Sequence, residues 1–204
     1  MDTTESSDEL IGRLRSEVRI RLGPLAPRRV TGPQWSIAEA RLGFRLPSVL
    51  WRLYSEVGDG GFGPHHGGLF PVDRFLRHYE KHRRERTVDR PNWPHALLPV
   101  CDWGCGIESA LDCSDPATPV VRVDDCLDPR FMREQWGREA GPTLYAKFAD
   151  DQFATWFESP SVTRWLRDWL AGKDWMEGLI PKRPKGGRLL PGPDGPALTP
   201  PPMP

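Results

Sequence analysis

The chain has no long apolar run and no excess of charge of either sign. No stretch of its 204 residues approaches the roughly 20 consecutive apolar residues of a membrane-spanning helix. Lys plus Arg equal Asp plus Glu, with 28 of each, so the overall charge favours neither nucleic acid nor an anionic membrane as a partner. The first nine residues are polar and acidic, unlike the basic start of a signal peptide. We therefore expect a cytoplasmic protein.

Cysteine pairs of the kind that hold zinc are also lacking. The four cysteines, Cys101, Cys105, Cys113 and Cys126, include no CxxC pair, and only the first two meet the looser zinc spacing. Without a secretion signal the thiols should be reduced, and free cysteines usually pack as small buried hydrophobes. We expect no metal and no other cofactor; a structural zinc is the alternative.

Signatures of catalysis are equally scarce. The glycine-rich stretch from Gly58 to Gly63 lacks the Gly-Lys-Ser/Thr end of a P-loop and follows a helix, the reverse of the dinucleotide-binding order. His65 and His66 point apart on an extended chain, which makes them poor co-ligands. No cysteine stands at a strand-to-helix turn that would lower its pKa. We expect no catalytic residue, with a Cys- or His-dependent hydrolase as the alternative.

The chain does contain a regular order of short helices and strands. Helical spacing puts four apolar residues of segment 46–57 on one face: Leu50, Leu53, Tyr54 and Val57. Gly58 then stands where a left-handed cap is needed, and Gly60 and Gly61 turn the chain. Similar patterns predict helices capped by Ser7 or Asp8, by Asp73 and by Ser161, one that begins at Gly32, and a short helix over 153–157.

Short β-prone runs predict the sheet. Segments 96–101, 107–113 and 119–123 are joined by turn residues, which favours an antiparallel meander; 69–72 and 145–148 are predicted as further strands. Five large aromatic residues should be mostly buried in the core: Trp51, Tyr54, Trp156, Trp165 and Trp169. One domain over 9–178 is expected between a disordered start, 1–8, and a Pro-rich disordered tail, 179–204.

Acidic residues cluster in one part of the sequence. Residues 101–128 carry seven acidic side chains and a single basic one, Arg122. We interpret the cluster as a negative surface that docks a basic partner, with Trp103 as a rigid anchor. The candidate partner-binding residues are Asp102, Trp103, Glu108, Asp112, Asp124 and Asp125. The alternatives are solvated turns and strand edges for the acids, and a core position for Trp103.

The order of the motifs resembles the SMI1/KNR4 family, also called the SUKH superfamily, over residues 33–172. The order is LG-x-x-LP, helix, GG-x-G, strand, helix, strand, DWGCG, strand. The resemblance is carried by Leu42-Gly43, Leu46-Pro47, Tyr54, Gly60-Gly61, Leu98-Pro99, Asp102-Trp103-Gly104-Cys105, Pro119-Val120, Phe153, Trp156 and Trp165. Asp59 departs from the family, which commonly has asparagine before Gly-Gly.

The resemblance implies a single α+β domain with a mixed or antiparallel sheet flanked by helices. It implies structural roles for Gly58, Gly60, Gly61, Gly104 and Cys105, with no metal at the cysteine, and it supplies no catalytic residue. Bacterial members look like immunity proteins that neutralise polymorphic toxins, many of them nucleases, and fungal relatives act as regulatory scaffolds.

High Arg, Pro and Trp usage suggests an actinobacterial source, which favours the immunity function. The expected partner is a cognate toxin with a basic surface. The alternative is a scaffold or adaptor whose Pro-rich tail is a ligand for another domain.

Overall fold

A four-stranded antiparallel sheet forms the centre of the computed structural model, which describes residues 6–65, 67–84, 93–124 and 154–173. The strands lie side by side in chain order: β1 (Leu97–Gly104), β2 (Ile107–Asp112), β3 (Val120–Asp124) and β4 (Ala154–Ser159). Leu98 lies opposite Leu111 across the first pair, and Arg122 lies opposite Trp156 across the last. The predicted antiparallel meander is confirmed.

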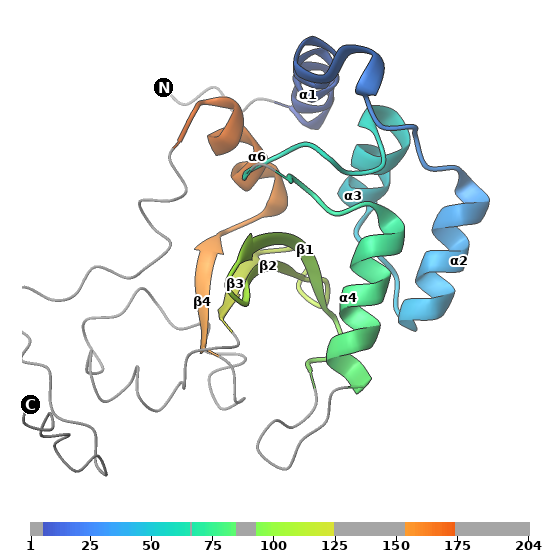
Figure 1. Cartoon of the computed structure of the whole chain (residues 1–204), viewed down its shortest axis with the longest axis vertical. Coiled ribbons are helices and arrows are strands. Elements are labelled where there is room, and N and C mark those ends of the chain that lie inside the picture. Colours follow the sequence, from blue (N-terminus) through green and yellow to red (C-terminus); the bar gives the residue numbers. More distant parts are fainter. Residues whose placement is uncertain (1–5, 66, 85–92, 125–153, 174–204) are drawn as a thin grey trace, which may run out of the picture.

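Helices cover the sheet. They are α1 (Ser7–Leu22), α2 (Gly32–Leu42), α3 (Ser48–Arg52), α4 (Val72–Arg84) and α6 (Val162–Leu170), with a 3-10 turn at Gly23–Leu25 and a π-helical turn at Leu53–Val57. Figure 1 shows α4 beside the sheet with α2 on its outer side, and α6 next to β4 with α1 beyond it. The chain is therefore a single α+β domain. None of the described helices is both long and apolar enough to cross a membrane.

The first helix shows how local sequence sets the elements. The Ser6 side chain accepts from the Glu9 backbone N–H and the Glu9 carboxylate accepts from the Ser6 N–H, which forms a capping box. The helix thus begins at Ser7 and is capped by Ser6, earlier than the expected cap and within the expected disordered start. Four residues of its inner face are buried: Leu10, Ile11, Leu14 and Val18.

The core contains most of the expected aromatic residues. Tyr54, Trp156 and Trp165 are buried, whereas Trp51 and Trp169 are half-buried against the core. The Tyr54 hydroxyl donates a hydrogen bond of 2.5 Å to the Phe70 carbonyl oxygen, which ties the π-helical turn to the start of α4. A buried tyrosine hydroxyl needs such a partner to offset its desolvation.

Gly58 has a different role from the predicted left-handed cap. Its φ of 168° is extended, and its N–H donates to the Leu53 carbonyl five residues back, which closes the π-helical turn. A Cβ at Gly58 would lie 2.6 Å from Pro27 Cγ, so glycine is needed there for close packing. Gly60 and Gly61, with φ of 70° and 74°, make the predicted turn.

Two segments differ from their expected structure. Residues 69–72 are not a strand: Phe70 donates one backbone hydrogen bond to Val100, but Pro71 has no N–H with which to extend a ladder. Residues 154–159 are strand β4, where a short helix was expected, because this run of β-prone residues pairs with β3. The expected strand at 145–148 and the Pro-rich tail lie outside the described residues.

Candidate functional site

The β1–β2 hairpin carries a half-buried tryptophan at its tip. A register shift between Asp102 and Gly104 places Trp103 in a β-bulge, and such bulges redirect side chains at strand ends. The turn Gly104-Cys105-Gly106 has φ values of 83°, 52° and 77°, which glycine adopts readily and which Cys105 adopts as an exception. The "WGCG" motif thus fixes both the hairpin and the orientation of Trp103.

Trp103 is held by three neighbours. Its Nε1 donates a 2.7 Å hydrogen bond to Ser109 Oγ. The Arg122 guanidinium lies 4.5 Å from its ring centroid, and the His65 ring centroid lies 5.2 Å away. A half-buried aromatic that is held in one orientation loses little entropy on binding, which is the property of an interface anchor. The two roles considered for Trp103, core plug and anchor, are therefore compatible.

A buried ion pair lies beneath Trp103. Arg122 Nη2 and Glu158 Oε1 are 2.6 Å apart, and the two side chains are only 1% and 5% exposed. Ser109 Oγ donates to the same carboxylate at 2.7 Å and Trp165 Nε1 at 2.9 Å. The network joins β2, β3, β4 and α6, and loss of one charge from such a pair costs about 3–5 kcal/mol.

The glycine loop, which we define as residues 58–65, contacts the β1–β2 hairpin. The Cys101 thiol donates to the Pro64 carbonyl oxygen at 3.6 Å, and the next residue in the loop, His65, lies against Trp103. Asp59 accepts a 2.7 Å hydrogen bond from the Val72 N–H at the start of α4. A carboxylate oxygen accepts this hydrogen bond just as an asparagine amide oxygen would. The replacement of the family's asparagine by Asp59 therefore leaves the loop intact.

The structure divides the six candidate partner-binding residues. Asp102 and Trp103 keep partial exposure at the hairpin, where Asp102 pairs with Arg74 at 3.0 Å. Asp112 is fully buried, and Glu108 and Asp124 are 9% and 6% exposed. Asp125 lies outside the described residues.

The register separates the three buried acids. Asp124 lies opposite Ile107, which places it on the other face of the sheet from Glu108, and Asp112 closes the far end of β2. The expectation that these acids share one exposed face is therefore wrong. They serve the fold: Asp112 accepts from the backbone N–H and the hydroxyl of Ser114 and so stabilises the turn after β2.

Glu108 forms a cluster with two histidines of α4. His78 Nδ1 and His82 Nε2 each lie 2.7 Å from one of its carboxylate oxygens. Burial alone would raise the pKa of Glu108, but the hydrogen bonds from His78 and His82 outweigh it and lower the pKa to about 2. The cluster was not predicted from the sequence, although the i, i+4 spacing in His78-Tyr-Glu-Lys-His82 was a visible signal.

The three described cysteines are far from forming one site. Cys105 is exposed at the hairpin turn and Cys113 follows the opposite end of β2, and a six-residue strand spans about 20 Å. Cys101 is buried in β1. Burial raises the pKa of the Cys101 and Cys113 thiols, which stay protonated at neutral pH. Cys126 lies outside the described residues.

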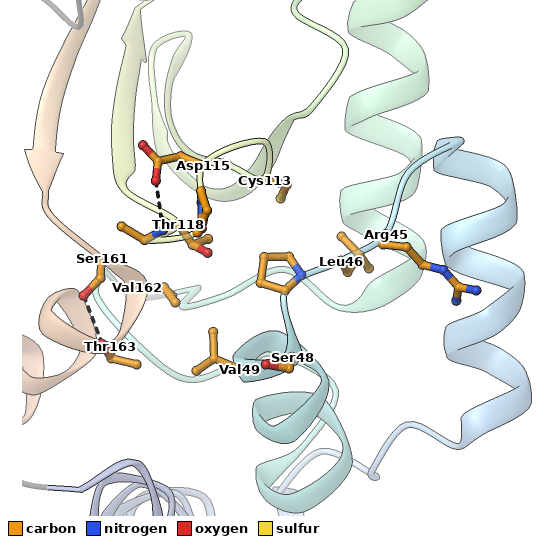
Figure 2. A pocket seen from close by; sticks show the side chains of 13 residues that line it. Arg45, Leu46, Ser48, Val49, Cys113, Asp115, Thr118, Ser161, Val162 and Thr163 are labelled. Atoms are coloured by element: carbon orange, nitrogen blue, oxygen red, sulfur yellow. Dashed lines mark hydrogen bonds between the residues drawn. The ribbon is translucent and has the colours of Figure 1, made fainter.

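A groove lies away from the β1–β2 hairpin. This groove of about 380 Å³ runs between the Leu46-Pro47 start of α3, the β2–β3 turn and the start of α6. Figure 2 shows Asp115 and Ser161 at its rim, engaged in local hydrogen bonds. Val162 donates a backbone hydrogen bond to the Thr118 carbonyl, which holds α6 against the turn. Leu46 is buried in the core and Pro47 caps α3, so the Leu46-Pro47 motif has a packing role.

These features together define a small α+β domain whose two distinctive motifs, the glycine loop and the "WGCG" hairpin, form one surface. The family model of the SMI1 / KNR4 family (SUKH-1) matches residues 30–159, and the chain belongs to this family. The match covers the hairpin, the glycine loop and all four strands. A comparison with curated proteins found no match.

Proposed function

We propose that this chain is a non-catalytic protein-binding domain that acts in the cytoplasm as an immunity protein and neutralises a cognate toxin by direct binding. Membership of the SMI1/KNR4 (SUKH-1) family is the observation that carries the proposal, because members of this family bind partner proteins. The protonated Cys101 and Cys113 thiols support the non-catalytic part, since neither is an activated nucleophile.

The partner contacts the hairpin surface, which we define as His65, Arg74, Asp102, Trp103 and Cys105. Trp103 supplies the rigid apolar contact, and Cys105 is exposed at the adjacent turn. The surface mixes both signs of charge, since Arg74 and Asp102 pair there. Glu108, Asp112 and Asp124 are left out because their side chains are buried. Electrostatic steering of a basic toxin then rests on fewer acids than the sequence alone suggested.

The test is inhibition and binding of a candidate toxin, chosen as one whose gene lies directly upstream of this gene. Purified chain should abolish the toxin's activity at equimolar amounts, and surface plasmon resonance should show direct binding. Cys105→Arg adds bulk and positive charge at the exposed turn while leaving the core untouched. It should weaken binding about tenfold or more, equivalent to a loss of about 1.4 kcal/mol or more, mainly through faster dissociation.

The matched control is Ile37→Arg, an equally bulky change at an exposed position of α2, where Ile37 is 60% exposed. It should leave the affinity unchanged. Equal affinity for both variants would exclude the hairpin surface but keep the immunity function. Absence of inhibition and binding by the unaltered chain would refute the function itself and would favour the scaffold alternative.

A further inference from the structure

The cluster of His78, His82 and Glu108 has the composition of a metal centre. Two histidines and a glutamate form the protein ligands of one class of zinc sites, in which the fourth position is held by water. The three ligand atoms, His78 Nδ1, His82 Nε2 and a Glu108 oxygen, lie within 4.8 Å of one another. Atoms bound to one tetrahedral zinc are about 3.4 Å apart, so small side-chain rotations suffice.

We propose that His78, His82 and Glu108 bind one divalent transition-metal ion, zinc by the chemistry of its ligands. The histidines come from successive turns of α4 and the glutamate from β2, so the ligands stand on rigid elements. Imidazole and carboxylate together suit zinc, whereas calcium and magnesium prefer an all-oxygen set. The sequence-based expectation of no metal considered the cysteines and the His65-His66 pair, none of which belongs to this site.

Both imidazole rings are already oriented. The His82 ring is stacked on Trp93 with centroids 4.1 Å apart and an angle of 10°, and the His78 ring lies 4.6 Å from Phe70. Rings held in this way need little reorganisation when the ion binds, which favours affinity. Arg74, one turn before His78 on α4, is paired with Asp102, which reduces its repulsion of a cation.

The site is also accessible. The side chains of His78, His82 and Glu108 are 27%, 14% and 12% exposed, so an ion can enter from solvent and keep a water ligand. In its absence the histidines hydrogen-bond the carboxylate and hold α4 against β2. The ion replaces those hydrogen bonds with coordinate bonds across the same two elements, and it should raise the melting temperature of the protein.

The experiment is a titration of the full, untagged, chelator-treated chain with zinc chloride by isothermal calorimetry at neutral pH. One zinc per chain should bind with a micromolar or lower dissociation constant. His78→Asn and His82→Gln each place an amide near the replaced nitrogen, so they retain a hydrogen-bond donor to Glu108 and lose a good metal ligand. Each should weaken zinc binding about tenfold or more.

His95→Asn and Cys105→Ser are the matched controls, because both residues lie outside the cluster, and neither should change the affinity. Cobalt absorption of the unaltered chain gives a measurement that needs no variant. Tetrahedral d–d bands without a thiolate-to-cobalt charge-transfer band support the site. A thiolate band, failure to bind zinc, or affinity that survives both histidine substitutions would overturn the proposal.

Discussion

The Gly60-Gly61 motif requires glycine for two different reasons, and alanine substitution at each position separates them. Both residues have positive φ, at 70° and 74°. A Cβ at Gly60 would lie 2.5 Å from the Leu69 carbonyl oxygen and 2.6 Å from the backbone of Phe70 and Pro71, whereas a Cβ at Gly61 would meet nothing within 4 Å. The second position therefore tests backbone strain alone, and the first tests strain together with a steric clash.

The expected magnitudes differ accordingly. Left-handed backbone costs an L-residue about 1–2 kcal/mol, partly offset by the lower entropy of alanine in the unfolded chain, so Gly61→Ala should cost about 1 kcal/mol. Gly60→Ala adds an overpacking penalty of about 1–3 kcal/mol, because the opposing atoms are backbone and cannot swing aside. Its total of about 2–4 kcal/mol is a large part of the stability of an ordinary domain.

Urea denaturation followed by tryptophan fluorescence and by circular dichroism measures both changes. The midpoint should fall with an unchanged m-value, since neither substitution alters the surface exposed on unfolding. Melting temperatures should fall by about 8 °C for Gly60→Ala and about 3 °C for Gly61→Ala. Equal losses, or a larger loss at Gly61, would refute the idea that the loop packs its backbone against residues 69–71.

The remaining predictions concern the thiols and the buried tyrosine. In a Cys126→Ser background, timed alkylation read by mass spectrometry should label the exposed Cys105 first and the half-buried Cys113 more slowly, with the buried Cys101 labelled only on unfolding; equal rates for Cys101 and Cys105 would contradict the burial of Cys101. Burial, and to a smaller extent Asp59 and Cys101, raise the pKa of Tyr54 in the folded protein. The contribution of Tyr54 to folding stability is therefore complete below about pH 10, and it is lost as the pH rises toward the pKa of Tyr54 in the folded protein. Tyr54→Phe should lower stability at neutral pH by about 1–3 kcal/mol through the lost hydrogen bond to Phe70. It should also reduce the loss of stability at alkaline pH. If urea denaturation gives parallel pH profiles for the two proteins, Tyr54 is not responsible for that loss.

Local patterns predicted most elements of the fold. The apolar face of segment 46–57 and the cap at Ser161 are set by neighbouring residues, so the sequence contains them. The run around Trp156 and Phe157 was assigned to a helix because periodicity cannot decide such a short apolar segment. Pairing with β3, which is distant in the sequence, decides it.

The candidate site shows the same limit. Trp103 and the glycine turn were identified from the sequence, whereas the burial of Glu108 was not, because its partners His78 and His82 stand 30 and 26 residues away. An acid in a cluster looks like a surface charge until its partner in space is known. Gly58 was misassigned for a similar reason, since the contact that requires glycine comes from Pro27.

The end of the sheet where β3 ends and β4 begins has a consequence for how such a domain acquires new binding properties. Asp124 and Ala154 are paired directly, and Ile107 beside them follows the hairpin turn. The connection 125–153 thus departs and returns next to the hairpin, and its anchoring strands are fastened by Arg122 and Glu158. Any sequence that joins Asp124 to Ala154 therefore starts and ends beside the hairpin surface. Exchanging residues 125–153 between relatives tests whether this connection sets partner specificity.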